Sequence, residues 1–137
     1  MIVSGRITDG GKPIKNASVF VYHTDVEGYY ANHRTDNGNE ARLHGAMRTD
    51  AKGRYEYRTI RPGSYANSRF PAHVHYVVHA EGYRDLVTEF NFDDDPFMND
   101  PGQREFAASR QRGIIKMTKD REGVWHGIFD VILSKDD

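Results

Sequence analysis

Short segments rich in β-branched and aromatic residues, separated by turn signals, recur along the whole of this 137-residue chain. Segments of this composition favour β-strands, and no stretch carries the apolar stripe at 3.6-residue spacing that predicts an amphipathic helix. The pattern therefore predicts an all-β fold, an antiparallel β-sandwich of seven or eight short strands that forms one domain over residues 1–137. The expected strands are residues 2–8, 17–22, 54–59, 74–80, 85–92, 113–117 and 124–133.

Residues 27–43 and 93–112 are long for loops in so small a domain. Loops of this length usually carry function or are mobile. We expect long active-site loops, with the first segment as the better candidate and the second mainly as a solvated connector. A short helix is expected near residues 105–110 of the second segment.

The charge balance and the absence of cysteine exclude several classes of protein. The chain has 19 basic and 20 acidic residues, so it shows no attraction to nucleic acid. Without cysteine, disulfides and thiolate metal ligands are excluded. No apolar leader or membrane span is recognisable, so we expect a cytoplasmic protein with no membrane partner. An exposed sheet edge leaves room for a homo-oligomer.

The stretch "PAHVHYVVH" places His73 and His75 at alternate positions of an expected strand. Because side chains in a strand alternate between faces, both imidazoles point to the same side. They are either two ligands of one metal ion or two polar residues on a hydrated face. His79 has the same parity, but it lies about 13 Å from His75 along a strand and is left out of the pair.

Two turns that precede the histidine strand in the sequence are each followed by tyrosines. Tyr65 comes directly after the tight turn at Pro62–Gly63, eight residues before His73. Tyr29 and Tyr30 follow a second turn, in "DVEGYY". Taken alone, a tyrosine in such a place most often packs over the rim of the core.

The order of these motifs resembles the intradiol ring-cleavage dioxygenases of the catechol and protocatechuate type. The resemblance covers nearly the whole chain, and its most specific part is "TIRPGSY" followed closely by "PAHVH". The other matching segments are "GRITDGGKPIKNASVFVYHTD", "DVEGYY", "GYRDLVTEFNFDDDP" and "GVWHGIFDVIL".

The resemblance implies a β-sandwich that holds a non-haem Fe(III) ion. It assigns four ligands: Tyr30 (with Tyr29 as the alternative register), Tyr65, His73 and His75. Anionic phenolate oxygen suits a hard cation such as Fe(III). The implied reaction is cleavage of a catechol by O2 to a muconate-type diacid. One of the two tyrosinates accepts a substrate proton, and Tyr65 is the favoured one.

Two positions depart from the family pattern. The family's arginine before Pro-Ala-His, which stabilises negative charge on the ring, is Phe70 here, and Arg69 lies one residue earlier. A one-residue shift reverses the face of a strand, so Arg69 takes this catalytic role only if the chain bulges. Glu89 stands where the family often has glutamine. A carboxylate there needs a partner, and we expect it either to pair with Arg69 or to recognise a cationic substrate group.

The interval between Tyr65 and His73 is shorter than is usual in the family, and an N-terminal helical region found in many catechol dioxygenases has no counterpart here. Both features predict an open site that accepts larger or substituted catechols.

Two alternatives from other classes remain. A transthyretin-like or carbohydrate-binding β-sandwich module also fits "GRITDGGKPIKNASVFVY", which is simply strand, turn and strand. A transthyretin-like hydrolase finds no supporting motif in "FDVILSKDD".

Overall fold

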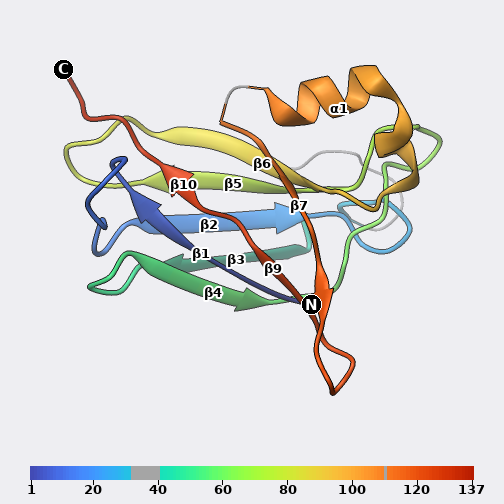
Figure 1. Cartoon of the computed structure of the whole chain (residues 1–137), viewed down its shortest axis with the longest axis horizontal. Coiled ribbons are helices and arrows are strands. Elements are labelled where there is room, and N and C mark those ends of the chain that lie inside the picture. The colour runs from blue at the N-terminus through green and yellow to red at the C-terminus, as the bar shows by residue number, and fades with distance from the viewer. Residues whose placement is uncertain (32–40, 110) are drawn as a thin grey trace.

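The computed structural model describes residues 1–31, 41–109 and 111–137, which form two mixed β-sheets and one α-helix (Figure 1). The first sheet contains β1 (Ile2–Thr8), β4 (Arg54–Arg58), β8 (Thr118–Lys119), β9 (Trp125–Ile128) and β10 (Val131–Ile132). The second has the order β3 (Leu43–Arg48), β2 (Ser18–His23), β5 (His73–His79), β6 (Leu86–Phe92) and β7 (Gly113–Ile115). A short 3₁₀ helix, η2 (Pro96–Asn99), precedes α1 (Pro101–Ala108).

The strand-rich fold agrees with the sequence pattern, but the sheets are mixed rather than antiparallel. In the second sheet β6 and β7 are parallel, and in the first sheet β1 is parallel to β9 and β10. A parallel pair needs a crossover connection, and residues 93–112 provide it through η2 and α1. The short helix expected in this segment is present as α1, and most of residues 93–109 are exposed, as expected of a solvated connector.

Several elements differ from those predicted, among them the following three. The helix starts at Pro101, after Asp100 accepts hydrogen bonds from the amides of Gly102 and Gln103, and ends at Ala108; Arg110 lies outside the described residues. No strand was expected at Leu43–Arg48, where Gly45 and Ala46 weaken the β pattern; pairing with β2 makes it one. The expected strand at residues 124–133 is divided into β9 and β10.

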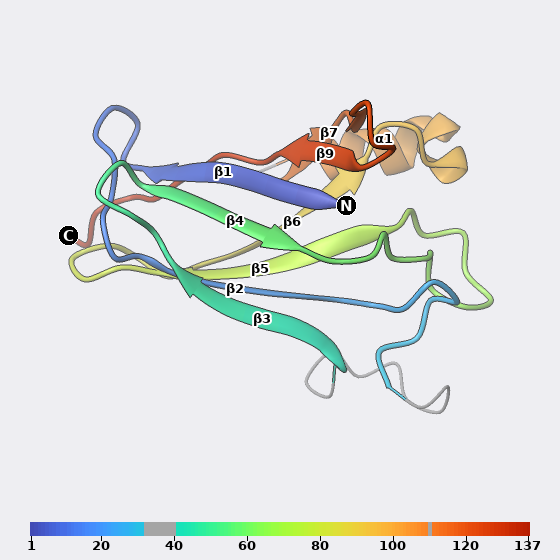
Figure 2. The same cartoon turned by 90° about the horizontal axis from the view of Figure 1, so that it is seen from below.

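The hydrophobic core lies between the two sheets, which form separate layers (Figure 2). Val3, Ile7 and Tyr55 contribute from the first sheet, and the second sheet contributes Val19, Val21, Val74, Tyr76, Val78 and Phe90. The Tyr57 and Tyr76 hydroxyls lie 2.7 Å apart, and the Tyr55 hydroxyl donates to the carbonyl oxygen of Phe129 at 2.5 Å. Polar groups in the core are thus satisfied across the layers.

The alternation of β5 places its two early histidines on the far side of the sheet from this core. Val74, Tyr76 and Val78 are fully buried in the core, so the residues between them face outward. His73 is nevertheless 5% exposed, because other parts of the chain cover that end of the outer face.

Among the described residues, no helix combines the length and hydropathy that a membrane crossing requires.

Replacing Tyr76 by phenylalanine should lower the free energy of unfolding by about 1–3 kcal/mol, because it leaves the Tyr57 hydroxyl in the core without this partner. Urea unfolding followed by circular dichroism measures the change. Tyr83→Phe, which removes a hydroxyl bonded to Asp9 near the surface, is the control and should change stability by less than about 0.5 kcal/mol. Equal effects of the two substitutions would contradict the role given to Tyr76.

Candidate metal centre

The start of β5 is anchored by polar residues of β6 and of the turn that follows it. The Ala72 amide donates to Asp95 Oδ2 at 2.9 Å, and Asn91 Nδ2 donates to the Ala72 carbonyl oxygen at 3.2 Å. Antiparallel pairing on both sides of β5 then places His75 between Tyr22 of β2 and Glu89 of β6. These contacts fix where the two imidazoles leave the sheet.

The two tyrosine-bearing turns contact each other through their backbones. The Gly63 amide donates to the Asp25 carbonyl oxygen at 2.8 Å, and Thr24 Oγ1 donates to the Gly63 carbonyl oxygen at 2.8 Å. Gly28 has a φ of +88°, and a Cβ added there would lie 1.8 Å from the Ser64 carbonyl oxygen. A Cβ at Gly63 would lie 2.3 Å from the Val26 carbonyl oxygen. Glycine is required at both positions for this close approach.

Four polar side-chain atoms converge where these turns meet β5. The Tyr30 hydroxyl lies 2.5 Å from the Tyr65 hydroxyl and 2.8 Å from His75 Nε2. The Tyr65 hydroxyl lies 2.9 Å from His73 Nε2 and 3.3 Å from His75 Nε2. The two Nε2 atoms are 3.1 Å apart, which confirms that the histidines share a face. Of the two registers considered, Tyr30 has its hydroxyl in this four-atom cluster.

The four-atom cluster has too few protons for its contacts. His73 Nδ1 lies 2.8 Å from the carbonyl oxygen of Pro71, which can only accept, so Nδ1 carries the proton and, in the neutral ring, Nε2 carries a lone pair. Burial lowers the pKa of His75 to about 4, so that ring is neutral and has one N–H. At most three protons therefore serve five short contacts, and lone pairs must face one another.

A bound cation resolves this shortage. Two atoms that bind one ion at about 2.0–2.2 Å lie no more than about 4.4 Å apart, and all five measured separations are shorter. Burial raises the pKa of the Tyr30 phenol well above its usual value, and the hydrogen bond with Tyr65 raises it further. A phenolate at Tyr30 thus requires a positive charge beside it. Two oxygens and two imidazole nitrogens suit a hard or intermediate metal ion.

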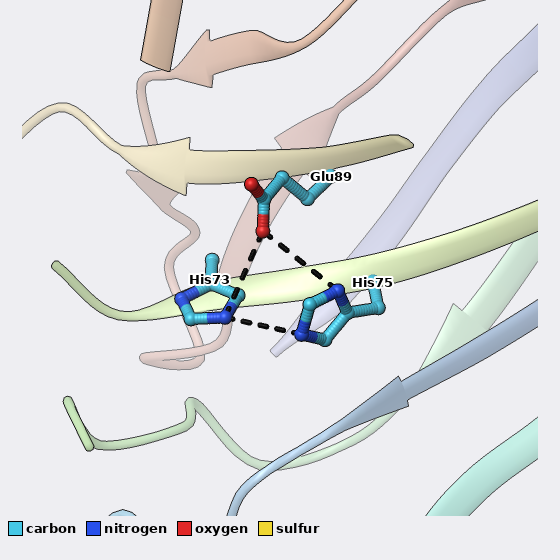
Figure 3. Close-up of side chains that lie close together, drawn as sticks. All are labelled: His73, His75 and Glu89. Atoms are coloured by element: carbon cyan, nitrogen blue, oxygen red, sulfur yellow. Dashed lines mark hydrogen bonds and ion pairs between the residues drawn. The ribbon is translucent and has the colours of Figure 1, made fainter. Parts of the chain in front are cut away.

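Glu89 lies beside both histidines and is 8% exposed. Its Oε2 is 3.7 Å from His73 Nε2 and 3.7 Å from His75 Nδ1 (Figure 3). The three side chains also form a group that could hold a metal ion, with candidate ligand atoms within 4.8 Å of one another. The Glu89 Oε1 accepts a hydrogen bond from Arg112 Nε at 3.0 Å. The partner of Glu89 is therefore Arg112, and the expected pairing with Arg69 is wrong.

The structure places Arg69 on another surface. Arg69 is exposed, and its guanidinium lies 5.4 Å from the centre of the Phe97 ring in η2. The next residue, Phe70, has its ring 6.0 Å from that of Tyr65 and 5.6 Å from that of His73. An aromatic ring thus lies beside the four-atom cluster at the position where the family pattern has an arginine. The catalytic role of Arg69 stays a prediction.

Two further residues at the site were not expected from the sequence. Tyr22 stacks on His75 with ring centroids 4.5 Å apart and an angle of 14° between the planes. Arg112 reaches Glu89 from the far end of the crossover. The sequence places Tyr22 in an expected strand, but its position beside His75 depends on the register between β2 and β5. His79, as expected, lies apart, paired with Asp85 at the surface, and His33 lies outside the described residues.

Comparisons with known proteins match this chain along most of its length. A family model described as "Dioxygenase" matches residues 1–134. The catechol 1,2-dioxygenase of Acinetobacter baylyi is 31% identical over 133 residues, which cover 84% of this chain and 42% of that protein. The protocatechuate 3,4-dioxygenase beta chain of Burkholderia cepacia is 34% identical over 150 residues, covering 97% of this chain and 63% of that protein.

A solved structure shows the same similarity. The crystal structure of catechol 1,2-dioxygenase from Pseudomonas arvilla C-1 aligns with a TM-score of 0.79 at 28% identity, over 100% of this chain and 52% of that one. The chain thus spans about half the length of the relatives it matches.

Replacing Gly63 by alanine should weaken metal binding at least about tenfold, because the added Cβ separates the two tyrosine-bearing turns. Uptake of ferric iron by the folded protein, measured by titration against a competing chelator, gives the affinity. The control is Gly45→Ala, since a Cβ at Gly45 meets no atom within 4 Å. If Gly63→Ala folds and binds the metal as tightly as the control, the contact between the turns does not assemble the cluster.

Proposed function

The chain belongs to the intradiol ring-cleavage dioxygenase family, and on this premise we propose that it uses ferric iron and O2 to cleave a catechol-type ring between the two hydroxylated carbons. The product is a muconate-type diacid, in which both atoms of O2 end in the two new carboxyl groups. The observation that carries the proposal is the convergence of two phenol oxygens and two imidazole nitrogens in one four-atom cluster.

The donor set fits ferric iron. Tyr30 and Tyr65 would supply two anionic oxygens, and His73 and His75 would supply two neutral nitrogens through Nε2. The phenolates reduce the positive charge of the site and so favour the ferric over the ferrous state. When bound, the ferric ion supplies Lewis acidity, which draws electron density from a chelated catechol and makes its ring susceptible to attack by O2.

One of the two tyrosines also accepts a proton from the substrate. A catechol that binds as a dianion must give up two protons; a tyrosinate that moved aside would accept one of them, and hydroxide at the site would accept the other. Tyr30 is 4% exposed, whereas Tyr65 is only partly buried. The difference in burial supports Tyr65 as the residue that moves aside and accepts the proton, with Tyr30 as the retained anchor.

The remaining aromatic side chains shape the surroundings of the cluster. Tyr22 covers one face of His75, and Phe70 lies beside Tyr65 and His73. These rings restrict the rotation of the imidazoles and exclude water from one side of the site. Exclusion of water strengthens the electrostatic interactions on which the reaction depends.

Protein reconstituted with Fe(III) should be coloured, with a tyrosinate-to-iron charge-transfer band, and should consume O2 when given a catechol. Tyr65→Phe should alter the band and lower kcat by about 10²–10⁴-fold, since it removes both a ligand and a proton acceptor. Tyr30→Phe should also alter the band. Visible spectra and an oxygen electrode, with a panel from bare catechol to bulky substituted catechols, measure these effects.

Tyr29→Phe is the matched control, because it removes the hydroxyl of the neighbouring residue and leaves the four-atom cluster intact. It should keep the spectrum and the rate of the unaltered protein. A colourless protein that consumes no O2 with any catechol would refute the enzymatic function. Unchanged spectra in both Tyr30→Phe and Tyr65→Phe would refute the ligand assignment.

A further inference from the structure

Glu89 lies at the Nδ1 edge of the His75 ring, and its Oε2 is equally close, at 3.7 Å, to His73 Nε2 of the four-atom cluster. The two residues are direct cross-strand partners between β5 and β6. Glu89 Oε2 faces His75 Nδ1 at 3.7 Å, whereas both tyrosine hydroxyls face His75 Nε2 (Figure 3). The separation of 3.7 Å is too long for a hydrogen bond, but the negative carboxylate, which can only accept, favours the tautomer of His75 that has its proton on Nδ1. That tautomer leaves the Nε2 lone pair directed into the cluster.

The tautomer of His73 is set in the same way by a different group. Its Nδ1–H donates to the Pro71 carbonyl oxygen, so its Nε2 lone pair also points into the four-atom cluster. The protein thus sets the tautomer of both rings from the side away from the tyrosines, once with a backbone carbonyl and once with a carboxylate. Groups of this kind commonly orient metal-binding histidines and increase their basicity.

Contacts with β6 and α1 hold Arg112 beside the buried Glu89 carboxylate. Thr88, next to Glu89 on β6, donates its hydroxyl proton to the carbonyl oxygen of Gln111 at 2.8 Å. This bond fixes the end of the crossover one residue before Arg112. The guanidinium also lies 4.3 Å from the centre of the Phe106 ring of α1. A side chain held by both β6 and α1 can neutralise Glu89, whose side chain is 10% exposed.

We propose that Glu89 is a positioning residue that orients the imidazole of His75 for metal binding, and that Arg112 holds the Glu89 carboxylate in this orientation. The inference rests on the proposed function, because it concerns the same metal centre. It replaces both expected roles of Glu89: its partner is not Arg69, and its charge is already paired with a guanidinium rather than open to a cationic substrate group.

The first experiment measures the tautomer of His75 in the metal-free full chain, labelled with ¹⁵N-histidine and followed by NMR. The unaltered protein should have the His75 proton on Nδ1. Glu89→Leu, which removes the acceptor, should abolish this preference. Glu89→Gln, which keeps an acceptor oxygen, should restore it. A proton on Nε2 in the unaltered protein, or no response to Glu89→Leu, would overturn the inference.

The second experiment measures ferric iron affinity by chelator competition in the same variants. Glu89→Leu should weaken binding by about 10–100-fold, and Glu89→Gln should lie closer to the unaltered protein. Asp93→Leu is the matched control, because it also breaks a carboxylate–arginine pair, with Arg104, at a more exposed position. Equal affinity of Glu89→Leu and Asp93→Leu would overturn the inference.

The outcomes separate this inference from the proposed function. If the unaltered protein binds no ferric iron, the proposed function fails, while the NMR measurement still decides whether Glu89 sets the tautomer of His75. If Glu89→Leu loses the iron entirely but keeps the parental tautomer, Glu89 acts as a direct ligand and the positioning role is refuted. Arg112→Gln should destabilise the fold, and adding Glu89→Gln should recover part of that stability, because the buried charge is then removed.

Discussion

The site depends first on the backbone contact between two turns. Tyr30 and Tyr65 are 35 residues apart, and their hydroxyls meet because the Gly63 amide bonds to the Asp25 carbonyl and the Gly28 Cα touches the next turn. The contact leaves no space for a side chain at either glycine. Since a single ion requires its ligands within a few ångströms, this approach of two loops sets the geometry that a bound metal ion would meet.

The second requirement is electrostatic. The four-atom cluster is partly buried and short of protons, so without a cation its lone pairs face one another. Burial raises the pKa of Tyr30 and lowers that of His75, which in both cases favours the neutral form. A metal ion reverses this preference for the phenols while it uses the imidazoles in their neutral form. Glu89 brings a negative charge close to the same place, and Arg112 balances it.

The crossover between β6 and β7 links the fold to the site. It makes a parallel strand pair, carries α1 across one end of the second sheet, and returns the chain beside Glu89. Phe106 of α1 contacts both Phe70 and Arg112, so the helix is joined to the tyrosine–histidine cluster through aromatic contacts. The family's arginine position is thus occupied by an aromatic ring, and the guanidinium that pairs with Glu89 beside the histidines is that of Arg112, after the crossover.

The sequence by itself determined the local features: the strand-rich composition, the same-face placement of His73 and His75, and the tyrosines that follow turns. These follow from short-range rules, namely the period of a strand and the conformations of proline and glycine. The grouping of the four proposed ligands came from the family resemblance, since no short-range rule joins the two turns to the histidine strand. Only the tertiary structure decided the mixed sheets, the stacking of Tyr22 on His75 and the pairing of Glu89 with Arg112. Each of these depends on the register between strands and on a crossover path, and neither is encoded in the residues nearby.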